Sequence, residues 1–165
     1  MVLIVKHARI NKNDMVNGEG VSVSFWTQGC PHRCPGCHNP ETWDFNGGKE
    51  KDVEDIINEI VESISANGIQ RNFSVLGGEP LCEENMINVL YIIQSIKRKF
   101  PTIKIYLWTG YTLEELKKEY YNTLDIKLQN IDVLITGRYI QEERDITLPL
   151  RGSRNQKVLY KGIDF

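Results

Sequence analysis

Three of the four cysteines in this 165-residue chain lie within one run of eight residues, CPHRCPGC. Cys30, Cys34 and Cys37 have the spacing C-x-x-x-C-x-x-C, which brings three thiolates together on a short loop. Iron–sulfur clusters are normally held by four cysteine thiolates. A cluster held by three leaves one iron without a protein ligand, and an open metal position is where chemistry takes place. The loop therefore predicts a catalytic cluster.

A closed zinc site is the second interpretation of this loop. With His32 or His38, the three cysteines would supply the four tetrahedral ligands of a structural Cys₃His site. Such sites usually take two ligand pairs from separate segments, whereas all the candidates here lie in one loop. The spacing favours a cluster, and a zinc-bearing interaction domain stays as the non-enzyme alternative. Cys82 is interpreted as a small, partly buried residue rather than as a fourth ligand.

Segments typical of strands and helices alternate along the chain and must position this loop. Residues 21–26 have apolar side chains at every second position, which predicts a strand that runs directly into the cysteine loop. Residues 51–66 have apolar side chains at helical spacing, and Thr112 followed by Glu115 predicts a capping box. The full prediction comprises strands at 21–26, 73–76, 103–108, 131–135 and 157–160, and helices at 51–66, at 84–99 and from 112 onward.

This alternation implies right-handed βαβ units, an α/β fold and a mainly parallel sheet, in a single domain that spans residues 1–165. A complete eightfold barrel needs about 250 residues, so we expect an open, partial (β/α) barrel. Unusual residues follow each predicted strand: the cysteine loop, then GGEP at 77–80, WTG at 108–110 and ITGR at 135–138. Because sites in parallel α/β folds lie at the carboxyl ends of the strands, these four segments should gather at one rim.

The GGEP segment suggests what the open iron position binds. Gly77 and Gly78 let backbone groups approach a ligand without obstruction by a Cβ atom. The carboxylate of Glu79 would receive an ammonium group. A ligand whose amino and carboxylate ends reach the open iron would place its amino group there. We therefore expect an amino acid derivative as the ligand.

Composition and charge exclude several other classes of protein. The formal net charge is −2, and the lysines and arginines are scattered along the chain, so we expect no nucleic-acid partner. Clustered rather than dispersed cysteines argue against a secreted disulfide framework and for a reducing compartment. No segment is typical of a signal peptide or a membrane span. We expect a cytoplasmic protein with no membrane partner.

The cysteine loop followed by GGEP resembles the radical S-adenosylmethionine superfamily. Within it, the chain is most similar to the activating proteins of anaerobic, glycyl-radical ribonucleotide reductases. The resemblance runs from Val16 to the RGSRNQ segment at 151–156, which is nearly the whole chain. The matching motifs are QGCPHRCPGCHNPETW, LGGEPL, WTGYTLEEL, DVLITGRY and RGSRNQKV.

The resemblance implies a radical S-adenosylmethionine fold and assigns roles by position. Three cysteines would hold a [4Fe-4S] cluster, whose fourth iron is chelated by S-adenosyl-L-methionine. The loop backbone would lie along the adenine, and GGE would hold the amino end of the methionine. The implied residues are Cys30, Cys34 and Cys37 for the cluster, Gly36, Cys37 and His38 for the adenine, and Gly77, Gly78 and Glu79 for the amino group.

The resemblance also implies a reaction and two partner proteins. Reductive cleavage of S-adenosyl-L-methionine would give a 5′-deoxyadenosyl radical, which takes a hydrogen atom from a backbone glycine of the catalytic subunit of the anaerobic ribonucleotide reductase. The electron would come from a low-potential flavodoxin or ferredoxin, because this cleavage needs a strongly reducing donor. The nearest enzyme alternatives are the activator of a different glycyl-radical enzyme and a synthase acting on a deazapurine precursor.

Two features leave roles open. Thr136 stands where the family usually has an acid, in the segment TGRY that includes Arg138. The RGSRNQ segment is either functional or a polar turn before the last strand. Its small and amide side chains suit tight turns, while Arg151 and Arg154 would suit a carboxylate or a partner chain.

Overall fold

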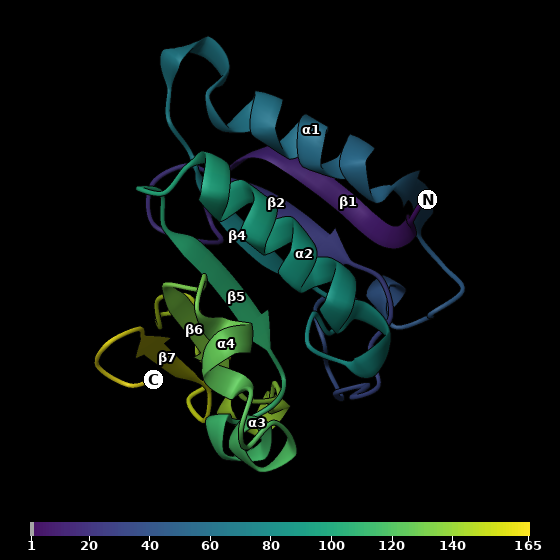
Figure 1. Ribbon diagram of the computed structural model, residues 1–165. Coiled ribbons are helices and arrows are strands. Elements are labelled where there is room, and N and C mark those ends of the chain that lie inside the picture. The colour runs from purple at the N-terminus through teal and green to yellow at the C-terminus, as the bar shows by residue number, and fades with distance from the viewer. Residues whose placement is uncertain (1) are drawn as a thin grey trace.

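A computed structural model describes residues 2–165, and its centre is a seven-stranded sheet in the order β3-β1-β2-β4-β5-β6-β7 (Figure 1). The central strands β2, β4, β5 and β6 pair in parallel, while β1, β3 and β7 add antiparallel pairs at the edges. Five of the seven strands, β2 to β6, thus run in one direction, and the prediction of a mainly parallel sheet is confirmed. The strands are β1 (Ile4–Asp14), β2 (Ser22–Thr27), β3 (Lys49–Asp52), β4 (Asn72–Gly77), β5 (Ile105–Thr109), β6 (Val133–Thr136) and β7 (Lys157–Tyr160).

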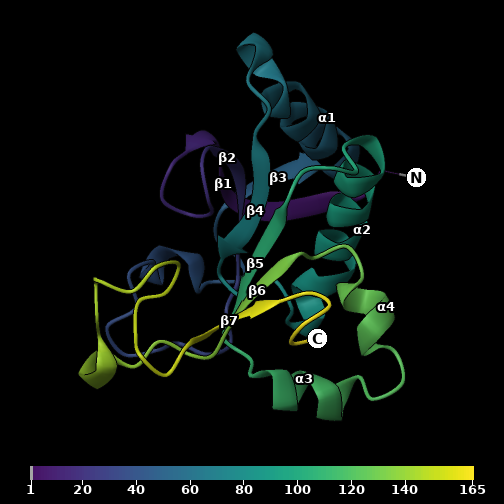
Figure 2. The ribbon, with the colours of Figure 1, turned by 90° about the vertical axis from the view of Figure 1, so that its left-hand side faces the viewer.

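The helices and the long loops lie on opposite sides of this sheet. Figure 2 shows α1, α2 and α4 on one side, with the loops that follow β1, β2 and β6 on the other. The helices are α1 (Val53–Ile64), α2 (Glu83–Lys99), α3 (Leu113–Glu119) and α4 (Leu124–Leu128). The loops are therefore free to enclose a site on the uncovered face.

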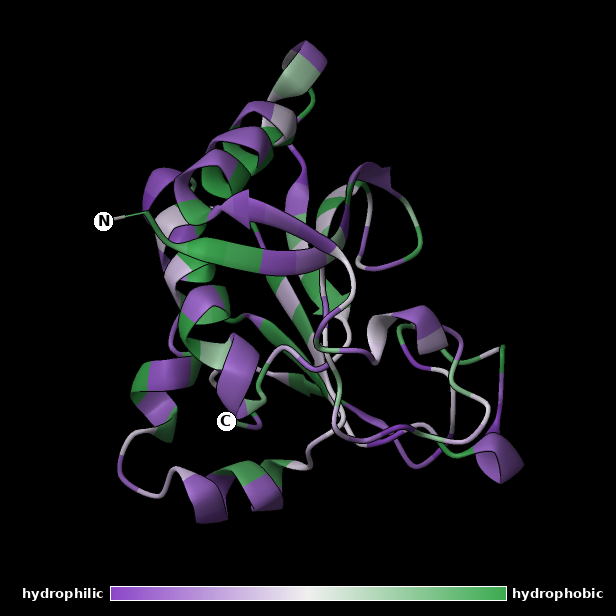
Figure 3. Ribbon diagram, turned by 90° about the vertical axis from the view of Figure 1, so that its right-hand side faces the viewer, coloured by the Kyte–Doolittle hydropathy of each residue, from purple (hydrophilic) through white to green (hydrophobic). Residues whose placement is uncertain are grey.

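Alternation along the strands decides which side chains face the helices. Phe25, Val75 and Leu107 are completely or almost completely buried and belong to the main core, together with Ile60 of α1 and Ile93 of α2. Hydrophobic residues lie along the strands and along the helices packed beside them (Figure 3). Full burial of one such side chain contributes about 1.5–3 kcal/mol. This layer holds the sheet in place while its other face remains available for loops.

Local sequence signals account for several helix boundaries. The predicted capping box is present: Glu115 N donates to Thr112 Oγ1 at 3.1 Å, and Thr112 N donates to Glu115 Oε2 at 2.8 Å. The helix predicted at 51–66 begins later, because Lys51 and Asp52 belong to β3. Asp52 caps α1 by accepting a hydrogen bond from Glu54 N at 2.9 Å.

The longest strand was not predicted. β1 spans 11 residues, IVKHARINKND, in which polar residues interrupt the apolar alternation. It is stabilised by antiparallel pairing on both edges, with β2 and β3. Within residues 2–165, no helix combines the length and apolar character needed to cross a lipid bilayer.

Candidate active site

The carboxyl ends of the four parallel strands open onto a cleft of about 450 Å³. All four segments that were expected at one rim contribute to its lining, so that prediction is confirmed. They contribute Cys30, Cys34 and Cys37 after β2, Gly77–Glu79 at the end of β4, Trp108–Gly110 at the end of β5, and Gly137–Tyr139 after β6.

A tight turn sets the positions of the second and third cysteines. Cys37 N donates to Cys34 O at 3.1 Å, which closes a four-residue turn. Pro35 occupies the second position, and Gly36 occupies the third with φ +76°. This is the pattern of a type II turn, which requires a positive φ at its third residue. The sequence CPGC is therefore sufficient to bring these two cysteines to the ends of one turn.

The first cysteine is anchored by the backbone that follows the loop. Gly29 N donates to Thr42 O at 2.8 Å and Cys30 N donates to Trp43 O at 3.1 Å. Cys30 is buried, and burial raises the pKa of its thiol; burial also raises the pKa of the Cys34 thiol. Thiolates are the form that binds metals, so loading this loop would release protons.

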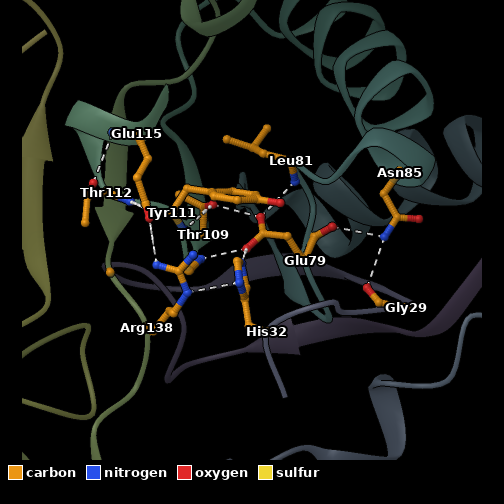
Figure 4. Close-up of polar contacts among 12 residues, drawn as sticks. Gly29, His32, Glu79, Leu81, Asn85, Thr109, Tyr111, Thr112, Glu115 and Arg138 are labelled. Carbon is orange, nitrogen blue, oxygen red and sulfur yellow. Dashed lines mark hydrogen bonds and ion pairs between the residues drawn. The ribbon is translucent and has the colours of Figure 1, made fainter. Parts of the chain in front are cut away.

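Glu79 is the centre of the polar network beside the cysteines (Figure 4). Its side chain is 1% exposed. Oε1 accepts hydrogen bonds from Leu81 N at 2.9 Å and from Thr109 Oγ1 at 2.8 Å. Oε2 accepts one from Gly110 N at 2.7 Å and lies 2.7 Å from His32 Nε2. A carboxylate offers about four lone-pair sites, so protein donors occupy all of those on Glu79.

The network continues from the cysteine loop to the segment after β6. Arg138 Nε donates to His32 Nδ1 at 3.2 Å. Because arginine has only donors, Nδ1 of His32 is the acceptor and its Nε2–H points at Glu79. Arg138 also binds Glu115 through NH1, at 3.0 and 3.2 Å from the two carboxylate oxygens (Figure 4). One continuous chain of contacts thus joins all four segments at the cleft to the start of α3.

Asn85 of α2 fastens the cysteine loop to the GGEP loop, a role that sequence reasoning missed. Its Nδ2 lies 3.2 Å from Gln28 O, 3.2 Å from Gly29 O and 3.0 Å from Glu79 O. Gly78 makes the same junction tight, since a Cβ atom added there would lie 2.4 Å from the carbonyl oxygen of Gly29. Only glycine fits at this position, because the two loop backbones pack against each other.

Comparison with known proteins identifies the family to which this chain is similar. Residues 16–159 match the family described as a 4Fe-4S single cluster domain. The anaerobic ribonucleoside-triphosphate reductase-activating protein of Escherichia coli (strain K12) is 39% identical over 148 residues, which cover 88% of this chain and 92% of the relative. The proteins of the same name from Haemophilus influenzae (39% identical, 87% and 90% covered) and Enterobacteria phage T4 (34% identical, 93% and 93% covered) are also similar.

The chain belongs to the family of anaerobic ribonucleoside-triphosphate reductase-activating proteins. This membership and the 4Fe-4S domain favour the iron–sulfur interpretation of the cysteine loop over the zinc interpretation. They also favour the ribonucleotide reductase branch over the other two enzyme alternatives. Across residues 2–165, no three histidine, cysteine, aspartate or glutamate side chains converge as they would around a single metal ion.

Seven of the eight predicted site residues line the cleft of this member of the activating-protein family, and one does not. The seven are Cys30, Cys34, Cys37, His38, Gly77, Gly78 and Glu79. Gly36 lies outside the lining, beside the side chain of Gln141. His38 lies close to Tyr139, with a ring-centroid distance of 5.0 Å.

Cys82 is separate from the cleft lining. It is 2% exposed at the N-cap of α2, and burial raises the pKa of its thiol to about 12. The interpretation of Cys82 as a small buried residue is consistent with this environment.

The RGSRNQ segment is a folded turn that braces the segment after β6. The side chain of Gln156 accepts hydrogen bonds from Gly152 N and Ser153 N at 2.9 and 3.1 Å, and it donates to Gly137 O at 2.9 Å. Asn155 Nδ2 donates to Arg138 O at 2.7 Å. Thr136 is buried at the end of β6 between β5 and β7, and it is not part of the cleft lining.

Arg151 is the charged residue of this segment at the cleft, which Gly152 and Gln156 also line. It lines the cleft, and its NH1 donates to Gln156 O at 3.0 Å. Its Nε is buried and has no hydrogen-bond partner within residues 2–165. A buried guanidinium donor without an acceptor is costly, so this atom fits an anionic or carbonyl group brought by a ligand.

Proposed function

We propose that this protein carries a [4Fe-4S] cluster on Cys30, Cys34 and Cys37, reductively cleaves S-adenosyl-L-methionine, and places a glycyl radical on the anaerobic ribonucleotide reductase. The observation that carries the proposal is that all three cysteines of one loop line the same cleft, in a chain of the activating-protein family. A cluster held there would supply one electron to split S-adenosyl-L-methionine into methionine and a 5′-deoxyadenosyl radical, and that radical would take a hydrogen atom from a glycine to give 5′-deoxyadenosine and a glycyl radical.

The residues at the cleft fit both cofactors. Soft thiolates are the usual ligands of iron–sulfur clusters, and three cysteines of one loop supply them. The orphaned Nε of Arg151 suits the carboxylate of an amino acid ligand. Arginine is the residue best suited to hold a carboxylate.

We assign the amino end of S-adenosyl-L-methionine to the backbone of Gly77 and Gly78, and the adenine edge to the backbone of Cys37 and His38, while Gly36, outside the lining, supplies the positive φ of the turn that positions them. Because the lone pairs of Glu79 are occupied by protein donors, Glu79 contributes to this site by holding three loops together. Glycine at 78 lets the GGEP backbone lie directly on the cysteine loop.

The wider proposal covers the fold and the remaining partner. We propose a single domain with the geometry of an open, partial (β/α) barrel, supported by helices on one face of the sheet and the cleft on the other. The electron donor is a low-potential flavodoxin or ferredoxin, because cleavage of a sulfonium by one electron needs a donor near the reducing end of cluster potentials, which extend to about −700 mV.

The test begins with anaerobically purified, reconstituted protein. We expect a brown protein with iron and sulfide near four per chain, 5′-deoxyadenosine production with dithionite, and a glycyl-radical electron paramagnetic resonance signal on the matching reductase. Cys34→Ser should lose both the iron and the cleavage. A colourless protein that binds one zinc per chain and produces no deoxyadenosine would overturn the proposal.

A further inference from the structure

We propose that the apolar rim of the cleft is the docking surface for an extended, glycine-bearing segment of the reductase. The rim, called here the mouth patch, consists of Val16, Ile146, Leu148 and Leu150, all of which line the cleft. This inference rests on the proposed function, and it identifies where the protein substrate binds.

The mouth patch combines two exposed and two half-buried apolar side chains from two segments that are distant in the sequence. Val16 lies in the turn between β1 and β2 and is 80% exposed, and Ile146 lies in the loop between β6 and β7 and is 78% exposed. Figure 2 shows the loop between β1 and β2 and the loop between β6 and β7 on the side of the sheet away from α1 and α2. Both loops contain hydrophobic residues (Figure 3), and both contribute to the lining of the cleft. Single exposed apolar residues are ordinary, but apolar residues that flank one cleft from two sides are typical of an interaction site.

The Val16 side of the patch is held rigidly. Asp14 is buried, and its Oδ1 accepts hydrogen bonds from Val16 N at 2.9 Å and Asn17 N at 3.0 Å. Its Oδ2 accepts one from Ser24 Oγ at 2.7 Å, and Ser74 Oγ donates to Asn17 O at 2.6 Å. A buried carboxylate therefore ties the turn to the sheet and presents Val16 to solvent.

The opposite side is also fixed before any partner binds. Trp108 Nε1 donates to Leu150 O at 2.7 Å, and Leu150 has φ +62°. A leucine in this left-handed region is strained, and such strain persists where the surroundings hold the residue and is often found at ligand sites. Preformed surfaces lose less conformational entropy on binding, so a rigid rim suits recognition of a flexible peptide.

The position of the patch identifies the occupant. The hydrogen atom must be taken inside the cleft that the three cysteines line, so the polypeptide that bears it has to cross the rim. Trp26, Leu76 and Trp108 continue the apolar surface from the rim into the cleft. A reductase segment that enters the cleft at a glycine brings no side chain into this space. Apolar residues on either side of that glycine would contact Val16 and Ile146.

The test uses Val16→Glu, Ile146→Glu and the double variant, with Ile87→Glu as a matched control. Ile87 is 78% exposed on α2, in the helical layer on the other side of the sheet. Each cluster-loaded protein is reduced with dithionite and incubated with S-adenosyl-L-methionine. Deoxyadenosine is measured without reductase, and the glycyl-radical signal is measured over a range of reductase concentrations.

We expect iron content and reductase-independent deoxyadenosine production to stay at the wild-type level in all variants. Each mouth-patch variant should raise the reductase concentration for half-maximal radical formation about tenfold, and the double variant about a hundredfold. Ile87→Glu should behave as wild type. The yield at saturating reductase should be retained, because docking and not chemistry is affected.

Four results would overturn the docking surface while leaving the proposed function intact. The first is a double variant that needs no more reductase than the wild type for half-maximal radical formation, and the second is an Ile87→Glu variant that needs as much more as the mouth-patch variants. The third is a defect in radical formation that appears only when flavodoxin replaces dithionite as the reductant. The fourth is a change in self-association of the protein while its dependence on reductase concentration stays normal. Loss of reductase-independent cleavage in the variants would also overturn it, since the patch would then serve the cofactor. Failure of the wild type to cleave S-adenosyl-L-methionine at all would instead refute the proposed function.

Discussion

Replacement of Glu79 by glutamine tests whether this buried carboxylate holds the cleft together. The substitution keeps the shape of the side chain but replaces one carboxylate oxygen by an NH₂ group. That oxygen accepts two hydrogen bonds, whereas the NH₂ group is itself a donor and would face the same two donors without accepting from either. Each oxygen of Glu79 has two donors at 2.7–2.9 Å. Hydrogen bonds to a charged group contribute about 1.5–3 kcal/mol each, so the loss of two predicts a destabilisation of about 3–6 kcal/mol.

That loss is large against the total stability of a domain, about 5–15 kcal/mol. Unfolding by urea, followed by far-ultraviolet circular dichroism on anaerobic, cluster-loaded protein, would measure it. With a slope of about 2 kcal/mol per M, the midpoint should fall by about 1.5–3 M. Equal iron content in the two samples keeps the contribution of cluster binding the same.

Glu62→Gln is the matched control, because Glu62 is an exposed residue of α1. Surface substitutions of this kind usually change the free energy of unfolding by no more than about 0.5 kcal/mol. If the midpoint of Glu79→Gln lay within about 0.5 M of the wild type, the four hydrogen bonds would not carry the stability assigned to them, and the role of Glu79 as the junction of the loops would be refuted.

Three further substitutions probe the same site and its supports. Gly78→Ala forces a Cβ atom to within 2.4 Å of Gly29 O, so we expect a cost of about 1–3 kcal/mol and less iron per chain after reconstitution; full iron loading would argue against close loop packing. Cys82→Ser should retain iron and cleavage, and in cluster-free wild type Cys82 should be alkylated last at pH 8, because its thiol has a pKa of about 12; rapid labelling would contradict its burial. Burial raises the pKa of Asp14, but hydrogen bonds from Asn17, Ser24 and Val16 outweigh it and leave the pKa below its ordinary 3.8. The stability from Asp14 is therefore present above pH 3.8 and lost as the pH falls through the lowered folded pKa. Urea midpoints of Asp14→Asn should lie below those of the wild type at pH 7 and approach them as the pH falls below 3.8; a difference that stays constant with pH would refute this.

Local chemistry made much of the fold predictable from the sequence. The predicted capping box of Thr112 and Glu115 depends only on neighbouring residues. Strand β2 and its apolar alternation were likewise predicted within one residue at each end. Because right-handed βαβ connections make consecutive strands parallel, the gathering of four loops at one rim also followed from the order of elements.

Strand pairing between distant segments was harder to predict from the sequence. β1 has a polar sequence and becomes a strand through its two neighbours, and β3 takes Lys51 and Asp52 from the start of the predicted helix because it pairs with β1. Strand preference depends on such cross-strand contacts more than on the residues themselves.

The sequence by itself determined the donor atoms of this protein: three thiols in one loop, and glycines and a carboxylate after the next parallel strand. Only the tertiary structure decided what these groups contact. Glu79 was expected to face a ligand, yet its carboxylate is occupied by donors from the cysteine loop, from its own loop and from the end of β5. Asn85 gave no signal, and the RGSRNQ segment did not reveal which groups Gln156 binds, because a hydrogen bond between distant residues exists only after the strands lie side by side. Spacing along the chain reports which atoms are present, whereas packing determines which of them remain free to bind.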